Sequence, residues 1–462
     1  MQNWKQFFKG KKVTVMGLGL LGRGVGDVAF LAWCGAEVLV TDLKTREQLA
    51  SSLAQLKRYK NISYTLGGHH LEDFKDCDFV LKAAGVPLES PYIAEARKNG
   101  VPIYMSTALF AKFAREMGAT IVGVTGTRGK STVTHLIYHA LTKAGKRAHL
   151  GGNVQGVSTL ALLPKIKKGD VCVLELDSWQ LQGFGELHIS PDVAVFTNLQ
   201  DDHLVYYRST SLHKTRDESL TASRELYFAD KANIFKFQKK GDTLIAGPHI
   251  AVRIQKERSP IAPLVPAPLP SAIKLKILGE HNRENAALAA AALCVLGISK
   301  SALRKWLKSF KPVAGRLEYL RTVRGIKIYN DNNATTPDAT IAALRALSLA
   351  PDVVGFKHLV PQGIVLICGG TDKGLDMSKL VAEIPKHCKA VILLRETGTE
   401  KLKKELANFT ERETLKECVE AAMQIAEKGD IILFSPALAS FGKWFKNEYD
   451  RSEQFVELVK KL

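Results

Sequence analysis

Apolar and polar positions along this chain follow two alternating periods, which predict strands and helices in turn. The short apolar runs at 12–16, 37–41 and 79–83 are typical of buried strands, and 21–35 has the apolar spacing of a helix. Strands that alternate with helices in this order build parallel, doubly wound sheets. We therefore predict an α/β domain at the start of the chain.

The same alternation returns twice further along the chain. A second α/β section begins near Ala119 and ends with a long helix that starts near Asn282 and contains the alanine-rich, strongly helix-forming stretch 286–296. Its predicted strands are 119–124, 171–176 and 193–197. The strands predicted for a third section are 326–329, 364–368, 390–394 and 430–434.

This pattern predicts three α/β domains, and we place them at 1–112, 113–312 and 313–462. The chain of 462 residues is too long for one core, because single cores stop growing well below that length. Several prolines between 260 and 270 interrupt regular structure there. We interpret that segment as a surface excursion inside the second domain rather than as a linker.

A glycine-rich turn joins a predicted strand to a predicted helix at 123–132, which reads G-V-T-G-T-R-G-K-S-T. In such a turn the backbone N–H groups converge on phosphate oxygens, Lys130 adds a cation, and Ser131 can hold Mg²⁺. The first glycine is Gly123, one residue earlier than in the plain phosphate-loop consensus. The turn predicts an ATP site built from Gly126, Thr127, Gly129, Lys130, Ser131 and Thr132.

A second glycine motif follows the first predicted strand. It reads G-L-G-L-L-G at 17–22, and Asp42 ends the next strand twenty residues later. This spacing is the dinucleotide-binding fingerprint, in which the acid contacts a ribose. Because the fold hosts many ligands, a nicotinamide or flavin dinucleotide and a nucleotide-sugar diphosphate are both compatible with it.

Two further polar residues follow apolar strands of the second section. Glu175 ends the run before L-D-S-W-Q-L, where a carboxylate can hold a Mg²⁺ that Ser131 and the phosphates share. His203 follows the strand that leads into N-L-Q-D-D-H. Ligands of open α/β sheets bind at the carboxyl ends of strands. We therefore predict that Lys130, Glu175 and His203 meet in one crevice.

Charge and cysteine content narrow the class of protein. The net charge of +19 suits nucleic acid, an acidic membrane or small anionic substrates, but the sequence has no basic stripe interleaved with aromatic residues. No run of about 18 apolar residues is present. The seven cysteines are scattered and never in C-x-x-C spacing, which favours reduced thiols. We expect a cytoplasmic protein with no nucleic-acid partner and no membrane insertion.

Five motifs, taken together and in order, resemble the Mur ligases of peptidoglycan synthesis over nearly the whole chain. They are G-V-T-G-T-R-G-K-S-T, L-E-L-D-S-W-Q-L, N-L-Q-D-D-H-L, G-E-H-N-R-E-N and S-P-A-L-A-S-F. The resemblance is greatest to the members that add D-glutamate. It implies a Rossmann-like N-terminal domain for UDP-N-acetylmuramoyl-L-alanine, a central P-loop ATPase domain and a Rossmann-like C-terminal domain for the amino acid. It also implies a ligation through an acyl phosphate, with two Mg²⁺ ions.

The resemblance assigns a role to each matching position. Catalysis falls to Lys130, His203 and Lys231, and the metal ligands are Ser131, Glu175, His203 and Lys231. Beyond the glycine turn, the implied ATP contacts are Asn282, Asn285, Arg316 and Asp331. The implied UDP-substrate contacts are Leu20, Leu21, Asp42, Lys44, Gly85, Asn153 and Gln180. The implied amino-acid contacts are Lys373, Ser440, Phe441 and Tyr449.

Family members hold their second Mg²⁺ partly through a carbamylated lysine, which forms when a neutral amine captures carbon dioxide. We place it at Lys231, because its apolar surroundings resemble the family segment whereas Lys214 lies in a polar stretch. Some positions depart from the family pattern. The segment 210–224 resembles an insertion, Asp177 stands where serine is commoner, and Asn333 stands where some relatives have lysine.

Other functions stay open at this point. A sibling that adds another amino acid, or a folate-type polyglutamate ligase, would use the same ATP chemistry, although the folate type lacks the first domain. A nicotinamide dehydrogenase would use 17–22 and leave 123–131 idle. A nucleic-acid-stimulated ATPase would leave the first domain unexplained. We expect a monomer.

Overall fold

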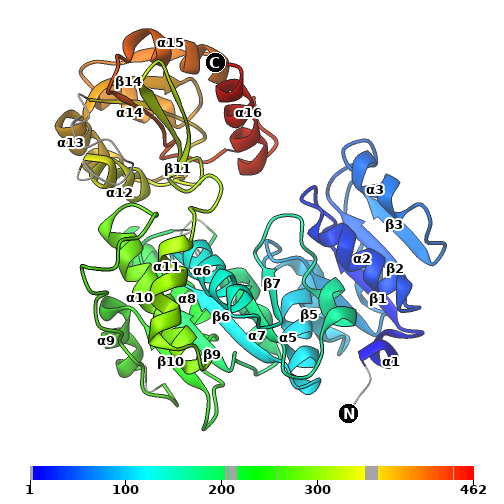
Figure 1. The fold of residues 1–462 in the computed structure, drawn as a ribbon. Helices are drawn as coiled ribbons and strands as arrows, with labels where there is room; N and C mark the ends of the chain where they lie inside the picture. Colours follow the sequence, from blue (N-terminus) through cyan, green and yellow to red (C-terminus); the bar gives the residue numbers. More distant parts are fainter. Residues whose placement is uncertain (1–3, 203–205, 208–215, 258, 349–362, 441) are drawn as a thin grey trace. The chain divides into compact units, whose positions relative to one another are not determined.

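The computed structural model describes residues 4–202, 206–207, 216–257, 259–348, 363–440 and 442–462. It contains three β-sheets with helices packed around them (Figure 1). They fall into two compact units, Met1–Ala267 with Asn285–Leu303 and Pro268–Glu284 with Arg304–Leu462. The first unit holds two sheets and the second unit holds one.

The first sheet is parallel and has the strand order β3-β2-β1-β4-β5. Its strands are β1 (Lys12–Met16), β2 (Glu37–Asp42), β3 (Ile62–Leu66), β4 (Phe79–Lys82) and β5 (Ile103–Tyr104). Its helical elements are α1 (Trp4–Phe8), α2 (Arg23–Trp33), α3 (Ala50–Leu56), η1 (Leu71–Phe74) and α4 (Pro91–Lys98). The strand order reverses between β1 and β4, where ligands of such sheets bind.

The second sheet is also parallel and has the order β10-β9-β6-β8-β7. Its strands are β6 (Thr120–Thr125), β7 (Ala148–Gly152), β8 (Val171–Glu175), β9 (Val193–Phe196) and β10 (Thr243–Ala246). The helical elements of this part of the chain are α5 (Ser106–Glu116), α6 (Lys130–Lys143), η2 (Leu160–Lys165), α7 (Ser178–Glu186), α8 (Arg216–Ala232), α9 (Pro248–Lys256), α10 (Glu280–Val295) and α11 (Lys300–Ser309).

The third sheet is mixed and has the order β11-β12-β16-β13-β14-β15, with only β11 antiparallel to its neighbour. Its strands are β11 (Glu318–Val323), β12 (Ile326–Asn330), β13 (Ile364–Cys368), β14 (Cys388–Leu394), β15 (Thr410–Arg412) and β16 (Ile431–Phe434). Its helices are α12 (Pro337–Ser348), α13 (Ser378–His387), α14 (Thr399–Glu405), α15 (Leu415–Ile425) and α16 (Glu448–Lys460).

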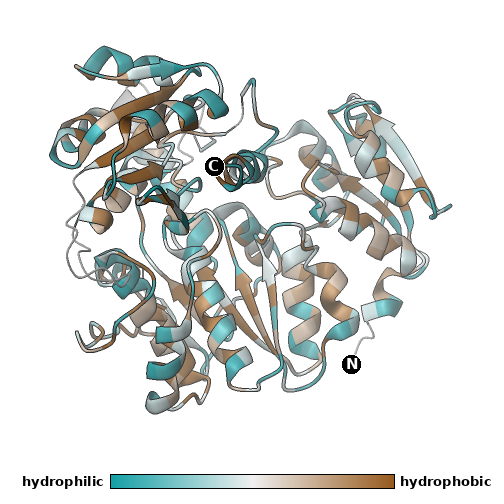
Figure 2. Ribbon diagram, turned by 45° about the horizontal axis from the view of Figure 1, so that its top comes forward, coloured by the Kyte–Doolittle hydropathy of each residue, from teal (hydrophilic) through white to brown (hydrophobic). Residues whose placement is uncertain are grey.

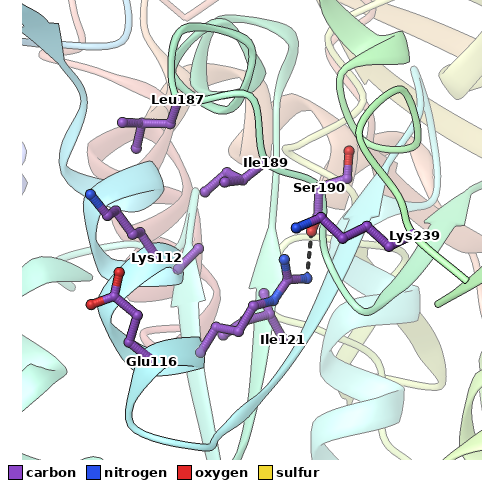
Figure 3. Close-up of a pocket in the computed structure, with 9 residues that line it drawn as sticks. Lys112, Glu116, Ile121, Leu187, Ile189, Ser190 and Lys239 are labelled. Atoms are coloured by element: carbon purple, nitrogen blue, oxygen red, sulfur yellow. Dashed lines mark hydrogen bonds between the residues drawn. The ribbon is translucent and has the colours of Figure 1, made fainter. Parts of the chain in front are cut away.

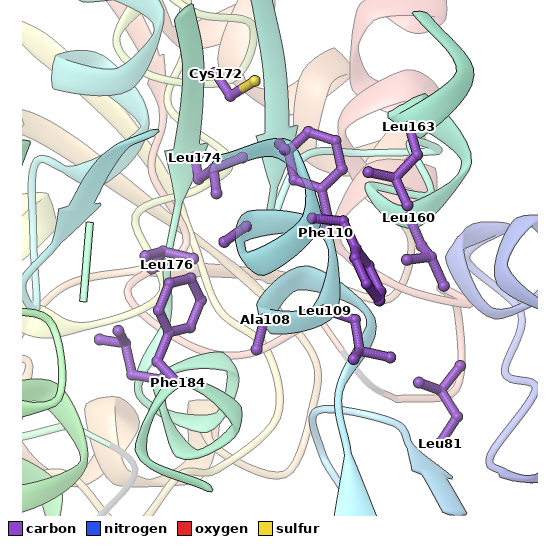
Figure 4. Packing of buried hydrophobic residues seen from close by; sticks show 14 of the residues in the cluster. Leu81, Ala108, Leu109, Phe110, Leu160, Leu163, Cys172, Leu174, Leu176 and Phe184 are labelled. Atoms are coloured by element: carbon purple, nitrogen blue, oxygen red, sulfur yellow. The ribbon is translucent and has the colours of Figure 1, made fainter. Parts of the chain in front are cut away.

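Burial explains why the inner strands are continuous apolar runs. Both faces of a parallel sheet are covered by helices, so every side chain of β4, β8, β9, β13 and β16 is buried. Figure 2 shows these apolar strands enclosed by helices with polar outer faces. One apolar cluster joins the first two sheets, and Leu81 of β4, Phe110 of α5 and Leu174 of β8 belong to it (Figure 4).

The predicted α/β fold class is confirmed. The predicted domain boundaries stay predictions. Residue 112 falls inside α5, and residue 312 lies between α11 and β11. In the segment with several prolines, Leu264 pairs with the outer edge of β10, because its backbone bonds Leu244 and Ala246. All seven cysteines are free, and none of the described helices is long and apolar enough to span a bilayer.

Candidate functional site

The glycine turn between β6 and α6 has no room for a side chain at two of its glycines. Gly126 and Gly129 have φ values of +141° and +84°. A Cβ on Gly126 would lie 1.9 Å from Thr197 Oγ1, and one on Gly129 would lie 2.2 Å from Asn285 Oδ1. Helix α6 begins directly after Gly129, so its N-terminal N–H groups and the turn face the same point. This arrangement is a ready-made anion site.

The turn is held in place from the end of β9. Thr127 N–H donates to Asn198 O at 2.9 Å, and Arg128 N–H donates to Asn198 Oδ1 at 2.9 Å. The Thr127 hydroxyl donates to Gln200 O at 3.1 Å. The segment 198–200, which leads to His203, therefore shapes the phosphate turn. His203 itself lies outside the described residues.

Lys130, the first residue of α6, folds back over the turn. Its Nζ donates to Gly126 O at 3.0 Å and to Thr127 O at 3.1 Å. The next two residues, Ser131 and Thr132, are buried in the first turn of the helix. The positive charge and the Ser131 hydroxyl thus lie at the same helix end as the N–H groups, which is the arrangement that binding a phosphate with its Mg²⁺ requires.

Glu175 ends β8, the strand beside β6, and it pairs in register with Val124. It is 4% exposed. A single strand-end carboxylate beside a phosphate turn suits Mg²⁺, which binds through one or two carboxylates plus substrate phosphates. Among the described residues, no group of three or more His, Cys, Asp or Glu side chains forms a metal cage. One carboxylate and one hydroxyl, from Glu175 and Ser131, fit a Mg²⁺ ion whose other ligands are phosphate oxygens of the nucleotide.

Lys231 lies in α8 with its side chain turned into the protein, and it is 1% exposed. Its Nζ donates to Gly126 O at 3.0 Å and to Thr125 Oγ1 at 3.4 Å. Burial and the nearby charge of Lys130 hold the pKa of Lys231 well below its usual value. A neutral amine at this position can react with carbon dioxide, as carbamylation requires. Lys214, the alternative, lies outside the described residues.

Tyr227 was missed by the sequence reasoning. Its ring centroid lies 4.7 Å from Lys231 Nζ, and its hydroxyl lies 3.3 Å from Thr127 Oγ1. Burial raises the pKa of this phenol. The tyrosine therefore ties α8 to the phosphate turn and stays a neutral hydroxyl. Its spacing of four residues from Lys231, on one helix face, was the available signal.

At the switch point of the first sheet, Asp42 holds the loop that carries the first glycine motif. Its Oδ2 accepts from Leu18 N–H at 2.9 Å and Gly19 N–H at 3.0 Å, and its Oδ1 accepts from Lys44 N–H at 2.9 Å. With 4% exposure, this carboxylate is bound to the protein's own backbone. Its contact with the uracil end of the substrate stays a prediction, as do those of Leu20, Leu21, Lys44 and Gly85.

Two other predicted substrate contacts also have protein partners. Asn153 follows β7, and its Oδ1 accepts from Arg23 Nη1 at 2.6 Å, which joins the first helix after the glycine motif to the second sheet. Gln180 is 5% exposed and completes the capping box at the start of α7 with Asp177. Its Nε2 donates to Thr107 Oγ1 at 3.2 Å. Asp177 is the N-cap of α7, a role that serine fills equally well, so the change from serine has no structural explanation.

In the second unit, Asp331 lies directly after β12. Its carboxylate accepts from Leu317 N–H and from the Ser435 hydroxyl, each at 2.9 Å. Burial raises the pKa of Asp331 to about 7. Arg316 lies one residue before Leu317 and is half-buried. Asn282 donates to Leu278 O at 2.7 Å within α10 and the turn before it.

The predicted amino-acid contacts also lie in the second unit. Lys373, after β13, donates to Thr335 Oγ1 at 3.2 Å. Ser440 is buried, and Tyr449 lies half-buried in the first turn of α16. Phe441 lies outside the described residues. The roles of all four residues as amino-acid contacts stay predictions.

Arg451 was also missed, although it is fully buried beside this group. Its Nε and Nη2 donate to Asn332 Oδ1 at 2.7 Å and Asn332 O at 3.0 Å, and its Nη1 donates to Ala439 O at 3.1 Å. The guanidinium therefore fixes the backbone next to Ser440. In sequence it is an ordinary arginine on a polar helix, and no signal in the pattern marks it.

A separate hollow of about 230 Å³ lies near the start of β6, at the end of the second sheet away from the phosphate turn (Figure 3). Apolar side chains of Ile121, Leu187 and Ile189 line it together with Lys112 and Lys239. Arg115 Nη2 closes one side by donating to Ser190 O at 2.5 Å. Of the predicted ATP, metal and substrate residues that the structure describes, none lines this hollow.

Three family models match this chain. Residues 11–105 match the model described as "Mur ligase MurD-like, N-terminal domain", and residues 124–258 match the "Mur ligase middle domain". Residues 315–438 match the model "Mur ligase, glutamate ligase domain". Each match falls on a different one of the three sheets.

Curated relatives match over almost the full length. A UDP-N-acetylmuramoylalanine--D-glutamate ligase of Roseiflexus sp. (strain RS-1) is 33% identical, over 97% of this chain and 98% of the relative. The enzyme of the same name from Borreliella afzelii (strain PKo) is 33% identical over 98% of both chains. Among solved structures, UDP-N-acetylmuramate-alanine ligase from Thermotoga maritima has a TM-score of 0.60 at 20% identity, covering 98% of this chain and 99% of its own. That likeness concerns the fold alone.

Proposed function

Because the chain belongs to the Mur ligase family, we propose that it joins D-glutamate to UDP-N-acetylmuramoyl-L-alanine, an ATP-dependent step of peptidoglycan synthesis. It is an ATP-dependent ligase. The observation that carries the substrate assignment is the match to D-glutamate ligases over 97% or more of the chain. The geometry supports the chemistry, since the buried amine of Lys231 lies against the same carbonyl, Gly126 O, that Lys130 contacts.

The reaction must activate a carboxylate, which is a poor acyl donor at neutral pH. A carboxylate oxygen of the UDP substrate attacks the γ-phosphorus of ATP, and the bond to the β-phosphate oxygen breaks to release ADP. The amine of D-glutamate then attacks the acyl phosphate. Phosphate leaves with the electron pair, and the amine gives up a proton. The products are an amide, ADP and phosphate.

The residues around the glycine turn would act on the γ-phosphate. The N–H groups at the start of α6 and the Lys130 cation would hold its oxygens and stabilise the charge that develops during transfer. Ser131 and Glu175 would hold one Mg²⁺, and His203 and a carbamylated Lys231 would hold a second. Bound Mg²⁺ would neutralise charge on the phosphates and on the attacking carboxylate.

The carbamate on Lys231 follows from the state of its amine. A neutral Nζ attacks the carbon of carbon dioxide, forms an N–C bond and loses one proton, which leaves an anion in place of the neutral amine. Burial supports the first condition, because it disfavours the charged form of the lysine. The new anion would lie beside the Lys130 cation, which favours it. That this carbamate forms on Lys231 is a proposal, and mass spectrometry of the intact, undenatured protein can test it.

The experiment that tests the function measures ADP release from purified protein with ATP, Mg²⁺, UDP-N-acetylmuramoyl-L-alanine and D-glutamate, leaving out each substrate in turn. We expect ADP only when all are present, together with the amide product in mass spectrometry. ADP release that ignores either substrate would overturn the ligase assignment. Turnover with L-lysine, meso-diaminopimelate or a folate in place of D-glutamate or the UDP substrate would assign a sibling activity.

We also propose that the protein acts as a monomer in the cytoplasm, without nucleic acid and without membrane insertion. The sequence supports the absence of a nucleic-acid partner, because it contains no basic stripe interleaved with aromatic residues. Sedimentation of the purified chain tests the monomer. Unchanged ADP release on addition of DNA or RNA tests the absence of a nucleic-acid partner.

A further inference from the structure

A buried lysine at the end of β4 has no role in the reaction described above. Lys82 is 2% exposed. Its Nζ donates to the carbonyls of Val86 at 2.6 Å and of Ala83 and Ala84 at 3.3 Å each. A fourth acceptor is Gln182 Oε1 at 3.4 Å. All four acceptors are neutral oxygens, so the loop after β4 is wrapped around a cation.

The loop that Lys82 organises lies at the switch point of the first sheet. Ala83 N–H donates to Met16 O at 3.0 Å, and a Cβ on Gly17 would lie 3.0 Å from Ala83 Cβ. The loop therefore borders the first glycine motif, and it contains Gly85. Since a trans peptide directs its N–H opposite to its C=O, carbonyls aimed at Lys82 turn the N–H groups of Ala84 and Gly85 away from it. That orientation presents N–H donors on the outer side of the loop.

A short chain of hydrogen bonds continues from this loop to the helix that carries Lys231. Gln182 lies in α7, and its Nε2 donates to Asp230 Oδ2 at 2.8 Å. The same oxygen accepts from the Tyr207 hydroxyl at 2.8 Å. Asp230 immediately precedes Lys231 in α8. One amide side chain thus bridges Lys82, the last residue of β4 in the first sheet, and the segment of α8 next to the phosphate turn.

We propose that Lys82 is a positioning residue: it sets the 83–86 loop for the UDP substrate and, through Gln182, links that loop to α8 next to Lys231. The proposal rests on the proposed function, because it names the UDP compound as the ligand of the loop. Burying a lysine is costly, and an apolar residue could fill the same volume. The carbonyls of Ala84 and Val86 would then lose the Lys82 donor, whereas Ala83 O would keep the Val86 N–H at 3.1 Å. The loop therefore depends on this cation for its shape at two of its three carbonyls.

The electrostatics agree with this geometry. Burial lowers the pKa of Lys82 to about 8, against the opposing charges of Asp177 and Asp230. Much of the charge is therefore retained near pH 7. At that pH the lysine can donate all three of its protons to the four oxygens around it.

The test compares Lys82→Met with Lys98→Met. Lys98 is an exposed lysine at the end of helix α4, in the same predicted domain. Lys82→Met should raise the KM and the Kd for UDP-N-acetylmuramoyl-L-alanine about tenfold, because hydrogen bonds from a charged donor are lost. The KM for ATP should change less than twofold. Lys98→Met should match the wild type in all three constants. An unchanged KM for the UDP substrate in folded Lys82→Met, or equal rises for ATP and the UDP substrate, would overturn the proposal.

Variants of Gln182 test the link and also serve if Lys82→Met does not fold. Gln182→Glu keeps an acceptor for Lys82 but cannot donate to Asp230, so the KM for the UDP substrate should stay within threefold while kcat falls about tenfold. Gln182→Met removes both contacts and should change both constants. A normal kcat in both variants would refute the link. If the wild type neither binds nor turns over the UDP substrate, the proposed function fails instead, which separates the two results.

Discussion

The glycine turn offers a sharp test, because two glycines at opposite ends of one helix have similar backbone angles and different surroundings. Gly129, before α6, has φ of +84° and would place a Cβ 2.2 Å from Asn285 Oδ1. Gly145, just after α6, has φ of +72° and nothing within 4 Å of such a Cβ. Alanine at either position meets a left-handed backbone, which costs about 1–2 kcal/mol. Only Gly129→Ala adds a steric overlap.

The size of that overlap sets the expected effect. Ordinary contacts begin near 3.4 Å, so Asn285 or the turn must move by about 1 Å. Overpacking of this kind costs about 1–3 kcal/mol beyond the backbone strain. A shift of about 1 Å in groups that position a substrate lowers catalysis by roughly a hundredfold. We therefore expect kcat/KM for ATP to fall about a hundredfold in Gly129→Ala and less than twofold in Gly145→Ala.

The assay is steady-state ADP release at saturating UDP substrate and D-glutamate, with thermal unfolding of each variant as the measure of stability. Gly145→Ala should lose about 1–2 kcal/mol of stability and keep its activity. The double variant Gly129→Ala/Asn285→Ala should have the same kcat/KM for ATP as Asn285→Ala alone, because the overlap is gone, although the backbone strain at 129 still lowers its stability. Equal kcat/KM in Gly129→Ala and Gly145→Ala would refute the reasoning that this turn binds phosphate.

Three further predictions concern charged groups. Lys130→Met should lower kcat about a thousandfold with unchanged circular dichroism, whereas Lys143→Met, at the exposed end of the same helix, should not; similar rates would remove the phosphate role. Lys231→Ala should abolish ADP release and regain part of it with formate or acetate, which supply the missing anion, while full activity without an additive would contradict the assignment. Burial raises the pKa of Asp331 from 3.8 to about 7, so the folded state binds this proton more tightly and the group's contribution to stability falls as pH rises between those values. The free energy of unfolding, measured by chemical denaturation, should therefore fall by about 4 kcal/mol less over this pH range in Asp331→Asn than in the wild type. Parallel pH profiles for the two proteins would show that the carboxyl is not buried as described.

The sequence predicted the inner strands and missed the outer ones, for one physical reason. The predicted runs correspond to the strands that have a neighbour on both sides, such as β1, β6 and β13. The missed strands β3, β5, β7, β10, β11 and β15 all lie at sheet edges. Most of them carry half-exposed side chains, as in β3 and β15, so they lack a continuous apolar run. The fold class depends on the inner strands, which is why it was predicted correctly.

At the site, the sequence was informative wherever the chemistry is local. The glycines, Lys130 and Ser131 follow one another along the chain, and each falls at the turn or the helix start that the motif predicts. Lys231 was chosen for its apolar surroundings, and the structure buries it against the turn. Asp42 shows the limit of a motif, because its position matches the fingerprint while its oxygens bind the backbone of 18, 19 and 44.

The residues that were missed share a different property: each is a polar side chain that the sequence places where exposure is usual. Arg451 lies on a polar helix, yet it is fully buried because its acceptors are supplied by Asn332 and Ala439. Lys82 ends an apolar strand, where a lysine ordinarily reaches water, and Gln182 lies a hundred positions away. Burial of such groups is decided by acceptors from distant segments, which periodicity cannot register. If Lys82 sets the 83–86 loop as proposed, the specificity of the first domain depends on a contact with Gln182 of helix α7, outside that domain. The isolated first domain should then bind the UDP substrate more weakly than the full chain does.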